Sequence, residues 1–130
     1  MRVLLDTNAF IWLTDDRKRT TLGKAAKRAI ADSAFVYVSS ISLVELRMKM
    51  MIGKMKMVPN LTEIISESGL VLLDFKADHA ETVPDFPSLV RHDPFDRMLL
   101  AQASAERMTF LTADTILLGL NLPFVVDARE

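Results

Sequence analysis

Arg2-Val-Leu-Leu-Asp6 is a short, almost uninterrupted apolar run that ends in an acidic residue. Similar runs recur along the chain, and we expect further strands at residues 35–38, 70–73, 108–111 and 124–126. Apolar runs without alternation are typical of strands that are covered on both faces, as in parallel sheets. With helix-compatible stretches between the runs, the sequence predicts a three-layer α/β/α sandwich around a mostly parallel sheet of about five strands.

The expected helices lie between these runs, at residues 22–31, 41–52, from 60 onward and 94–106. The last is the clearest, because its apolar residues recur at helical spacing, and Gly53 is a natural stop for the second. Pro84 and Pro87 indicate a loop before the last helix. Since there is no internal repeat and no linker, we expect residues 1–130 to form a single domain.

The composition excludes several kinds of site. There is no cysteine and there are only two histidines, so neither a thiolate site nor a histidine-rich zinc site is expected. Without a signal-peptide pattern or an apolar run of transmembrane length, the expected location is the cytoplasm. Residues 1–60 carry 11 of the 16 Lys and Arg but 5 of the 17 Asp and Glu. This asymmetry fits a basic rim beside an acidic pocket, and it equally fits two solvated surfaces.

Three acids fall where a parallel sheet would gather them. Asp6 ends the first strand, Glu45 lies early in the helix after the second, and Asp114 follows the fourth. Ligands of open parallel sheets bind at the carboxyl ends of the strands, so we expect these acids to converge. Asp93 and Asp96 bracket the start of the last long helix, and their distance from the others depends on the fold itself.

Most of these acids also have a structural interpretation. Ser42-Leu-Val-Glu45 has the spacing of a capping box, in which the glutamate binds backbone amides. Asp93 before Pro94 is a typical helix start, and Asp114 is suitably placed to cap the short stretch that follows it. The sequence alone therefore leaves a capping role open for all three acids.

Asp6 could cap a helix that is expected to begin near Asn8, but a capping role alone explains this residue less well than the others. A carboxylate that ends a buried strand costs several kcal/mol unless it is paired or metal-bound, and no basic residue adjoins it in the sequence. Several carboxylates held together repel one another unless a divalent cation neutralises them. Oxygen ligands favour Mg²⁺ or Mn²⁺, and such a site suits hydrolysis at phosphate.

Four blocks of sequence resemble a known family. They are Leu4-Leu-Asp6-Thr7-Asn8-Ala-Phe-Ile-Trp12, Ser39-Ser-Ile-Ser-Leu-Val-Glu45-Leu, His92-Asp-Pro-Phe-Asp96-Arg97-Met-Leu-Leu-Ala-Gln-Ala103 and Phe110-Leu-Thr112-Ala-Asp114. In this order they resemble PIN-domain proteins, and more narrowly the VapC-type toxins of bacterial type II toxin–antitoxin systems in the branch that carries Asp-Pro-Phe-Asp-Arg. The resemblance spans nearly the whole chain.

The resemblance implies a PIN-like α/β/α fold and a Mg²⁺- or Mn²⁺-dependent endoribonuclease that cleaves RNA with a metal-activated water. It also implies a homodimer and a cognate antitoxin that blocks the site, in a heterotetramer or a larger assembly. The catalytic, metal-binding quartet that it implies is Asp6, Glu45, Asp96 and Asp114. Three further residues fall near this quartet. For Asp93 the first interpretation is helix capping, whereas Asn8 and Thr112 would orient the metal ligands.

The chain departs from its relatives in two places. Val44 stands before the helical glutamate, where relatives often have a bulky aromatic residue. His92 stands directly before Asp93, whereas many relatives place the histidine one residue earlier. A histidine near a loop is commonly an incidental surface residue, so we assign His92 no role.

Partner and substrate contacts are indicated less specifically. The Met-rich segment, residues 48–57, holds five of the eight methionines, which suits an antitoxin surface and equally the core or a dimer interface. Basic residues that would edge an acidic pocket and bind RNA phosphates are Arg47, Lys49, Lys54, Lys56 and Arg97.

Three alternative functions remain to be compared with a ribonuclease. A PIN-fold DNA nuclease is the nearest, because a carboxylate–metal site does not itself distinguish the sugars. A catalytically silent partner-binding module is the second. A phosphorylated signalling domain fits poorly, because strand one ends in Asp6-Thr7 instead of an acid pair and no lysine follows the last strand.

Overall fold

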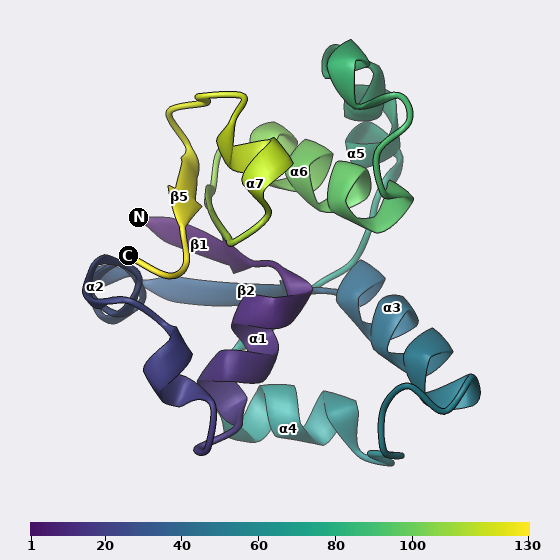
Figure 1. Cartoon of the computed structure of the whole chain (residues 1–130). Coiled ribbons are helices and arrows are strands. Elements are labelled where there is room, and N and C mark those ends of the chain that lie inside the picture. Colours follow the sequence, from purple (N-terminus) through teal and green to yellow (C-terminus); the bar gives the residue numbers. More distant parts are fainter.

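The computed structural model describes all 130 residues, and Figure 1 shows the path of the chain. One sheet contains the five strands β1 (Arg2–Leu5), β2 (Phe35–Ser39), β3 (Val71–Leu73), β4 (Thr109–Thr112) and β5 (Val125–Asp127). The strand order is β3-β2-β1-β4-β5, and every neighbouring pair is parallel. The predicted PIN-like α/β fold with five strands is confirmed, and the sheet is entirely parallel.

Seven helices flank the sheet: α1 (Thr7–Thr14), α2 (Lys24–Asp32), α3 (Ser40–Met51), α4 (Leu61–Glu67), α5 (Ala77–Thr82), α6 (Pro94–Glu106) and α7 (Thr115–Leu118). Helix α6 has the bounds that its apolar spacing predicts. Helix α5 was not predicted, because six residues are too few to display a helical period. Short 3₁₀ turns η2 (Val83–Asp85) and η3 (Pro87–Leu89) occupy the region that the prolines indicated as a loop, and η1 (Arg19–Thr21) follows α1.

The two faces of the sheet have separate hydrophobic cores. In β1, Val3 and Leu5 pack with residues of α1, α2, α3 and α4, whereas Leu4 packs with residues of α6 and α7. Figure 1 shows α1, α2 and α4 on one side of β1 and β2, with α5, α6 and α7 on the other. Because successive side chains of a strand point to opposite faces, a strand covered on both must be apolar throughout. This explains why the run at residues 2–5 does not alternate.

The order of the strands places the functional edge of the sheet. Strand β1 lies at the centre, with β2 on one side and β4 on the other. The order in which strands are added to the sheet therefore reverses its direction at β1. A crevice forms at such a switch point, at the carboxyl ends of the strands. Asp6 follows β1 there, and its backbone amide donates to the Leu111 carbonyl oxygen of β4 at 3.0 Å. Residues that follow β1 and β4 are therefore neighbours.

No helix in the structure combines the length and the apolar character that a membrane crossing requires.

Candidate metal centre

Asp6 is buried at the junction of β1 and α1, where its side chain is 5% exposed. Its Oδ1 accepts a hydrogen bond from the Ala9 amide at 2.8 Å and so caps α1, and its Oδ2 accepts one from Thr112 Oγ1 at 2.7 Å. Burial raises the pKa of Asp6 to about 6, and the negative charge of Glu45 adds to the rise, against the lowering effect of these hydrogen bonds. Its ionised form is thus held by hydrogen bonds but not compensated by a positive charge.

Glu45 lies near Asp6 and belongs to α3. The N-cap of α3 is Ser39, whose Oγ accepts from the Ile41 amide, so the capping box suggested by the Ser42–Glu45 spacing does not form. Glu45 Oε1 instead accepts from Thr7 Oγ1 at 2.7 Å, and Oε2 lies 3.4 Å from Lys49 Nζ. The carboxylate is therefore held toward the start of α1, beside Asp6.

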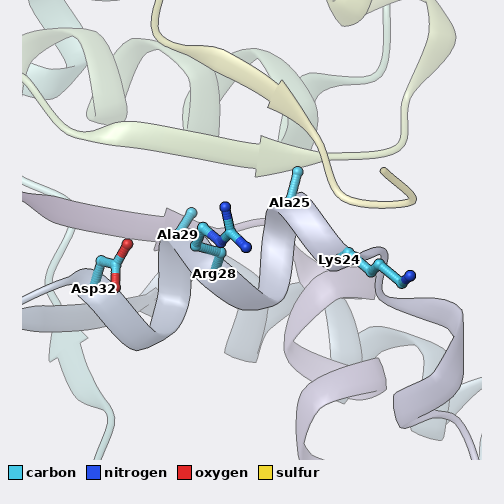
Figure 2. Close-up of a pocket in the computed structure, with 5 residues that line it drawn as sticks. All are labelled: Lys24, Ala25, Arg28, Ala29 and Asp32. Carbon is cyan, nitrogen blue, oxygen red and sulfur yellow. The ribbon is translucent and has the colours of Figure 1, made fainter.

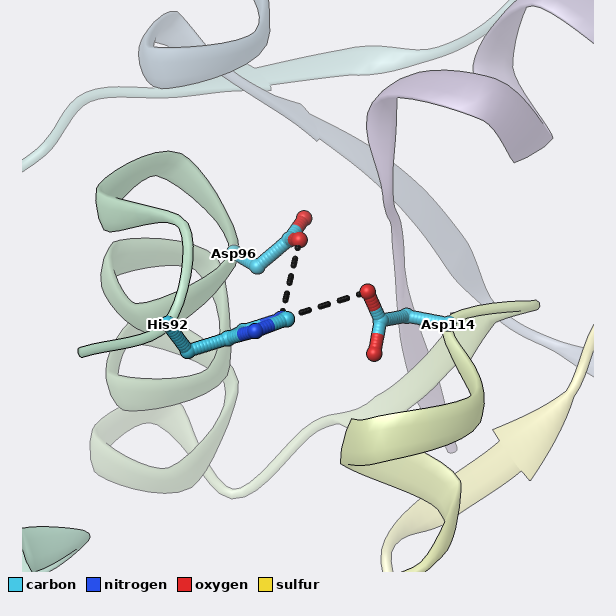
Figure 3. A group of neighbouring side chains, drawn as sticks. All are labelled: His92, Asp96 and Asp114. Atoms are coloured by element: carbon cyan, nitrogen blue, oxygen red, sulfur yellow. Dashed lines mark hydrogen bonds and ion pairs between the residues drawn. The ribbon is translucent and has the colours of Figure 1, made fainter. Parts of the chain in front are cut away.

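Asp96 and Asp114 meet around His92 (Figure 3). His92 Nε2 lies 3.3 Å from Asp96 Oδ2 and 3.2 Å from Asp114 Oδ2, and one ligand atom of each residue lies within 4.8 Å of the others. The His92 side chain is only 15% exposed, so its interpretation as an incidental surface residue was wrong. His92 precedes the N-cap of α6, so the helical spacing rule does not apply to it, and its contact with Asp114 depends on the fold.

The two aspartates titrate differently. Burial, together with the negative charges of Asp93 and Asp114, raises the pKa of Asp96 to about 7. Burial also acts to raise the pKa of Asp114, but the Leu117 and Ile116 amides, together with His92, outweigh it and hold that pKa below its usual value. Asp114 is therefore ionised at neutral pH, while Asp96 gains and loses its proton there.

Thr112 connects the two pairs of acids. It is fully buried at the end of β4, where its Oγ1 donates to Asp6 Oδ2 and accepts from the Asp114 amide at 3.1 Å. Asn8, the other residue expected to orient ligands, is instead exposed on α1, and its neighbour Thr7 makes the contact with Glu45. Thr7 and His92 are thus the two polar residues of this region that sequence reasoning did not assign.

The remaining predicted residues have mostly structural contacts. Asp93 caps α6, because its Oδ1 accepts from the Phe95 amide at 2.8 Å and the Asp96 amide at 3.3 Å. The Arg47 guanidinium donates to the carbonyl oxygens of Val58 and Pro59. Arg97 likewise donates to a carbonyl oxygen, that of Val90.

The donors present fit a divalent cation. The carboxylates of Asp6 and Asp96 both have raised pKa values, so in each the ionised form lacks sufficient positive compensation. A cation near them would supply that charge, and carboxylate oxygens are the ligands that Mg²⁺ and Mn²⁺ prefer. Asp96 and Asp114, which offer adjacent oxygens, would hold such an ion, with Asp6 and Glu45 beside them across Thr112.

Several hollows lie outside this acidic cluster, and two of them bear on the candidate function. One, of about 410 Å³, runs along α2 and is drawn in Figure 2; its lining residues are Lys24, Ala25, Arg28, Ala29 and Asp32. It contains a single carboxylate and none of the predicted site residues. The second, which we call the α1–α4 groove, has about 560 Å³, and its lining residues are Phe10, Ile11, Thr14, Asp15, Arg17, Lys18, Leu46, Lys54, Met55, Lys56, Met57, Val58, Leu61 and Ile64.

Three solved structures of complexes share the fold of this chain at low sequence identity. A toxin–antitoxin complex from Klebsiella pneumoniae has 22% identity, coverage of 98% of both chains and a TM-score of 0.69. VapBC2 from Rickettsia felis, bound to a DNA fragment from its promoter, has 20% identity, coverage of 97% of this chain and 96% of that chain, and a TM-score of 0.67. VapBC-1 from nontypeable Haemophilus influenzae has 15% identity, full coverage of both chains and a TM-score of 0.67.

Identities this low establish the shared fold only, and no curated protein matches the chain. The family evidence is independent of them. The family model that describes the PIN domain matches residues 3–120, which is most of the chain and contains all four predicted acids. The chain therefore belongs to the PIN-domain family.

Proposed function

We propose that this PIN-domain protein is a Mg²⁺- or Mn²⁺-dependent endoribonuclease and the toxin of a toxin–antitoxin pair, with residues 1–130 forming one nuclease domain that acts in the cytoplasm. The observation that carries the proposal is the meeting of Asp96 and Asp114, with Thr112 bonded both to the Asp114 amide and to Asp6, near whose carboxylate the charge of Glu45 lies. These side chains come from distant parts of the sequence, and helix capping alone gives no reason for them to gather.

In this proposal Asp6, Asp96 and Asp114 hold the cation, and Glu45 ligates it or orients the attacking water. A cation held by these carboxylates would supply a water of lowered pKa and positive charge for the leaving oxygen. The chain itself fixes the oxygens: the Ala9 amide and the Thr112 hydroxyl hold Asp6, and the Thr7 hydroxyl holds Glu45. Such hydrogen bonds orient metal ligands and are commonly as important as the ligands themselves.

Two lysines are the better candidates for binding RNA phosphates. Lys49 lies 3.4 Å from Glu45 and is 40% exposed, so its ammonium group borders the acids and still reaches solvent. Lys54 lines the α1–α4 groove. Arg47 and Arg97 already donate to backbone carbonyls, so we assign them a smaller contribution to phosphate binding.

We also propose two protein partners, a cognate antitoxin and a second copy of this chain. The Klebsiella pneumoniae structure that this fold resembles is named as a toxin–antitoxin complex, which supports an antitoxin partner. The methionines of the Met-rich segment lie in three places. Met50 is in the core, and Met55 and Met57 line the α1–α4 groove. Met48 and Met51 are exposed on α3. The groove is the more suitable for an antitoxin segment and the exposed face of α3 for a dimer contact.

A cleavage assay on matched oligonucleotides tests the activity. We expect the purified protein to cut single-stranded RNA in Mg²⁺ or Mn²⁺, to stop in EDTA and to leave DNA of the same sequence intact. Cleavage of the DNA instead would replace the proposal by a DNA nuclease. If neither strand is cut over a broad panel of sequences and calorimetry detects no Mg²⁺ or Mn²⁺ binding, the chain is a catalytically silent binding module.

A further inference from the structure

His92 supplies a third potential ligand atom at the acidic cluster. Its Nε2 faces Asp96 Oδ2 at 3.3 Å and Asp114 Oδ2 at 3.2 Å (Figure 3). An imidazole nitrogen carries at most one hydrogen, so it cannot donate a well-directed hydrogen bond to both oxygens. The two distances lie at and just beyond the upper end of the usual range of about 2.7–3.2 Å for an N–H···O bond. Hydrogen bonding alone therefore gives a weak account of this arrangement.

The same spacing suits neighbouring ligands of one cation. With metal–ligand distances of about 2.0–2.2 Å, two ligands at right angles lie roughly 3 Å apart, and two ligands at a tetrahedral angle lie somewhat farther apart. The separations of His92 Nε2 from both carboxylate oxygens fall in this range. Small adjustments would thus place all three atoms around a single ion.

The backbone holds these donors in place. The Oδ1 of Asp114 accepts from the Ile116 and Leu117 amides, both at 2.9 Å, which leaves Oδ2 directed toward His92. Asp96 lies in the first turn of α6, whose start Asp93 caps. The His92 amide donates to the Leu89 carbonyl oxygen at 2.9 Å, which ties the histidine to turn η3. The three ligand atoms therefore come from constrained parts of the fold.

We propose that His92 binds the divalent cation directly through Nε2, together with Asp96 and Asp114, and that this shifts the preference of the site from Mg²⁺ toward Mn²⁺ and Zn²⁺. The inference rests on the proposed function, because it concerns the same cation. Carboxylates alone suit Mg²⁺ and Mn²⁺, whereas an imidazole favours the later first-row metals, Zn²⁺ among them, and is a better ligand than a further water for Mn²⁺ than for Mg²⁺.

Pulsed electron paramagnetic resonance of Mn²⁺ bound to the wild-type protein tests the ligation without any mutation. A directly bound imidazole gives a nitrogen hyperfine coupling in the Mn²⁺ signal, and this coupling should be present. His79, the other histidine, is buried against Phe75 and Glu106 and does not belong to the cluster. Bound Mn²⁺ without a nitrogen coupling would overturn the role of His92 and leave the carboxylate site standing. No bound Mn²⁺ at all would overturn both.

Calorimetric titrations of His92→Ala test the preference. We expect the affinities for Zn²⁺ and Mn²⁺ to fall roughly tenfold or more, since loss of even a partner of a metal ligand costs that much. The affinity for Mg²⁺ should change far less, so the Zn²⁺-to-Mg²⁺ ratio falls. Arg91→Ala is the matched control, because Arg91 is the exposed neighbour of His92 and should leave the ratio unchanged. An equal loss for all three ions in a folded His92→Ala protein would contradict the proposed preference.

Discussion

Asp6→Asn is expected to reduce RNA cleavage by roughly 100-fold or more, because loss of an outer partner of a metal ligand already costs about 10–100-fold. The fold should survive. An asparagine can keep the Ala9 amide bond through Oδ1 and donate to Thr112 Oγ1 through Nδ2, so both contacts of Asp6 can be replaced. Initial rates on a cleaved RNA oligonucleotide measure the loss.

The same substitution should alter how the stability of the metal-free protein depends on pH. Burial raises the pKa of Asp6 to about 6 in the folded state, from 3.8 for an unperturbed aspartate. Between these values the folded state binds the proton more tightly than the unfolded state, so the stability falls as pH rises through this window and stays lower above it. The shift corresponds to about 3 kcal/mol. Asp6→Asn should therefore remove this fall and stabilise the metal-free protein at pH 8.

Asp16→Asn is the control for both effects, since Asp16 is an exposed aspartate paired only with Arg19 on the surface. It should cleave RNA at the wild-type rate and keep the wild-type pH dependence in chemical denaturation. If Asp6→Asn shows full cleavage once Mg²⁺ or Mn²⁺ is restored to metal-depleted buffer, Asp6 is only a helix cap.

Asp96→Asn is expected to lose both cation binding and cleavage, while Asp93→Asn keeps them. Asp93 and Asp96 lie three residues apart at the start of α6, so the two variants remove one negative charge from the same helix turn. Asparagine is as good an N-cap as aspartate, so Asp93→Asn retains the cap of α6. Only Asp96 offers a ligand atom to the cluster with Asp114. Calorimetric titration with Mn²⁺ and the cleavage assay should therefore separate the pair.

If both variants lose cation binding and cleavage equally, the negative charge at the start of α6 supports these activities and Asp96 is not a specific metal ligand. The thermal melting curves of both proteins provide the necessary check that α6 still packs against the sheet.

The sequence predicts the parts of this structure that depend on local pattern. Residues 3–5 and 110–111 are apolar because both faces of β1 and β4 are buried, and α6 begins at an Asp-Pro pair whose capping role is observed. Each of these features is written in a few adjacent residues. Their local patterns therefore give their positions to within a residue or two.

Features that depend on contacts across the fold could not be predicted in the same way. The Ser42–Glu45 spacing suggested a cap, but the helix begins at Ser40 and Glu45 meets Thr7 from a distant segment. His92 was assigned no role because nothing local places it against Asp114, which lies 22 residues farther along the chain. The resemblance to PIN domains predicted which acids to examine, whereas the link through Thr112 and the position of His92 came from the folded geometry.

The most direct test of the cation site is a crystal structure of the protein with Mn²⁺, located by anomalous scattering. The account predicts a peak within roughly 2.0–2.6 Å of carboxylate oxygens of both Asp96 and Asp114, on the side of Thr112 that faces Asp6. An ion found only at exposed acids elsewhere, with no density between Asp96 and Asp114 at saturating Mn²⁺, would contradict it.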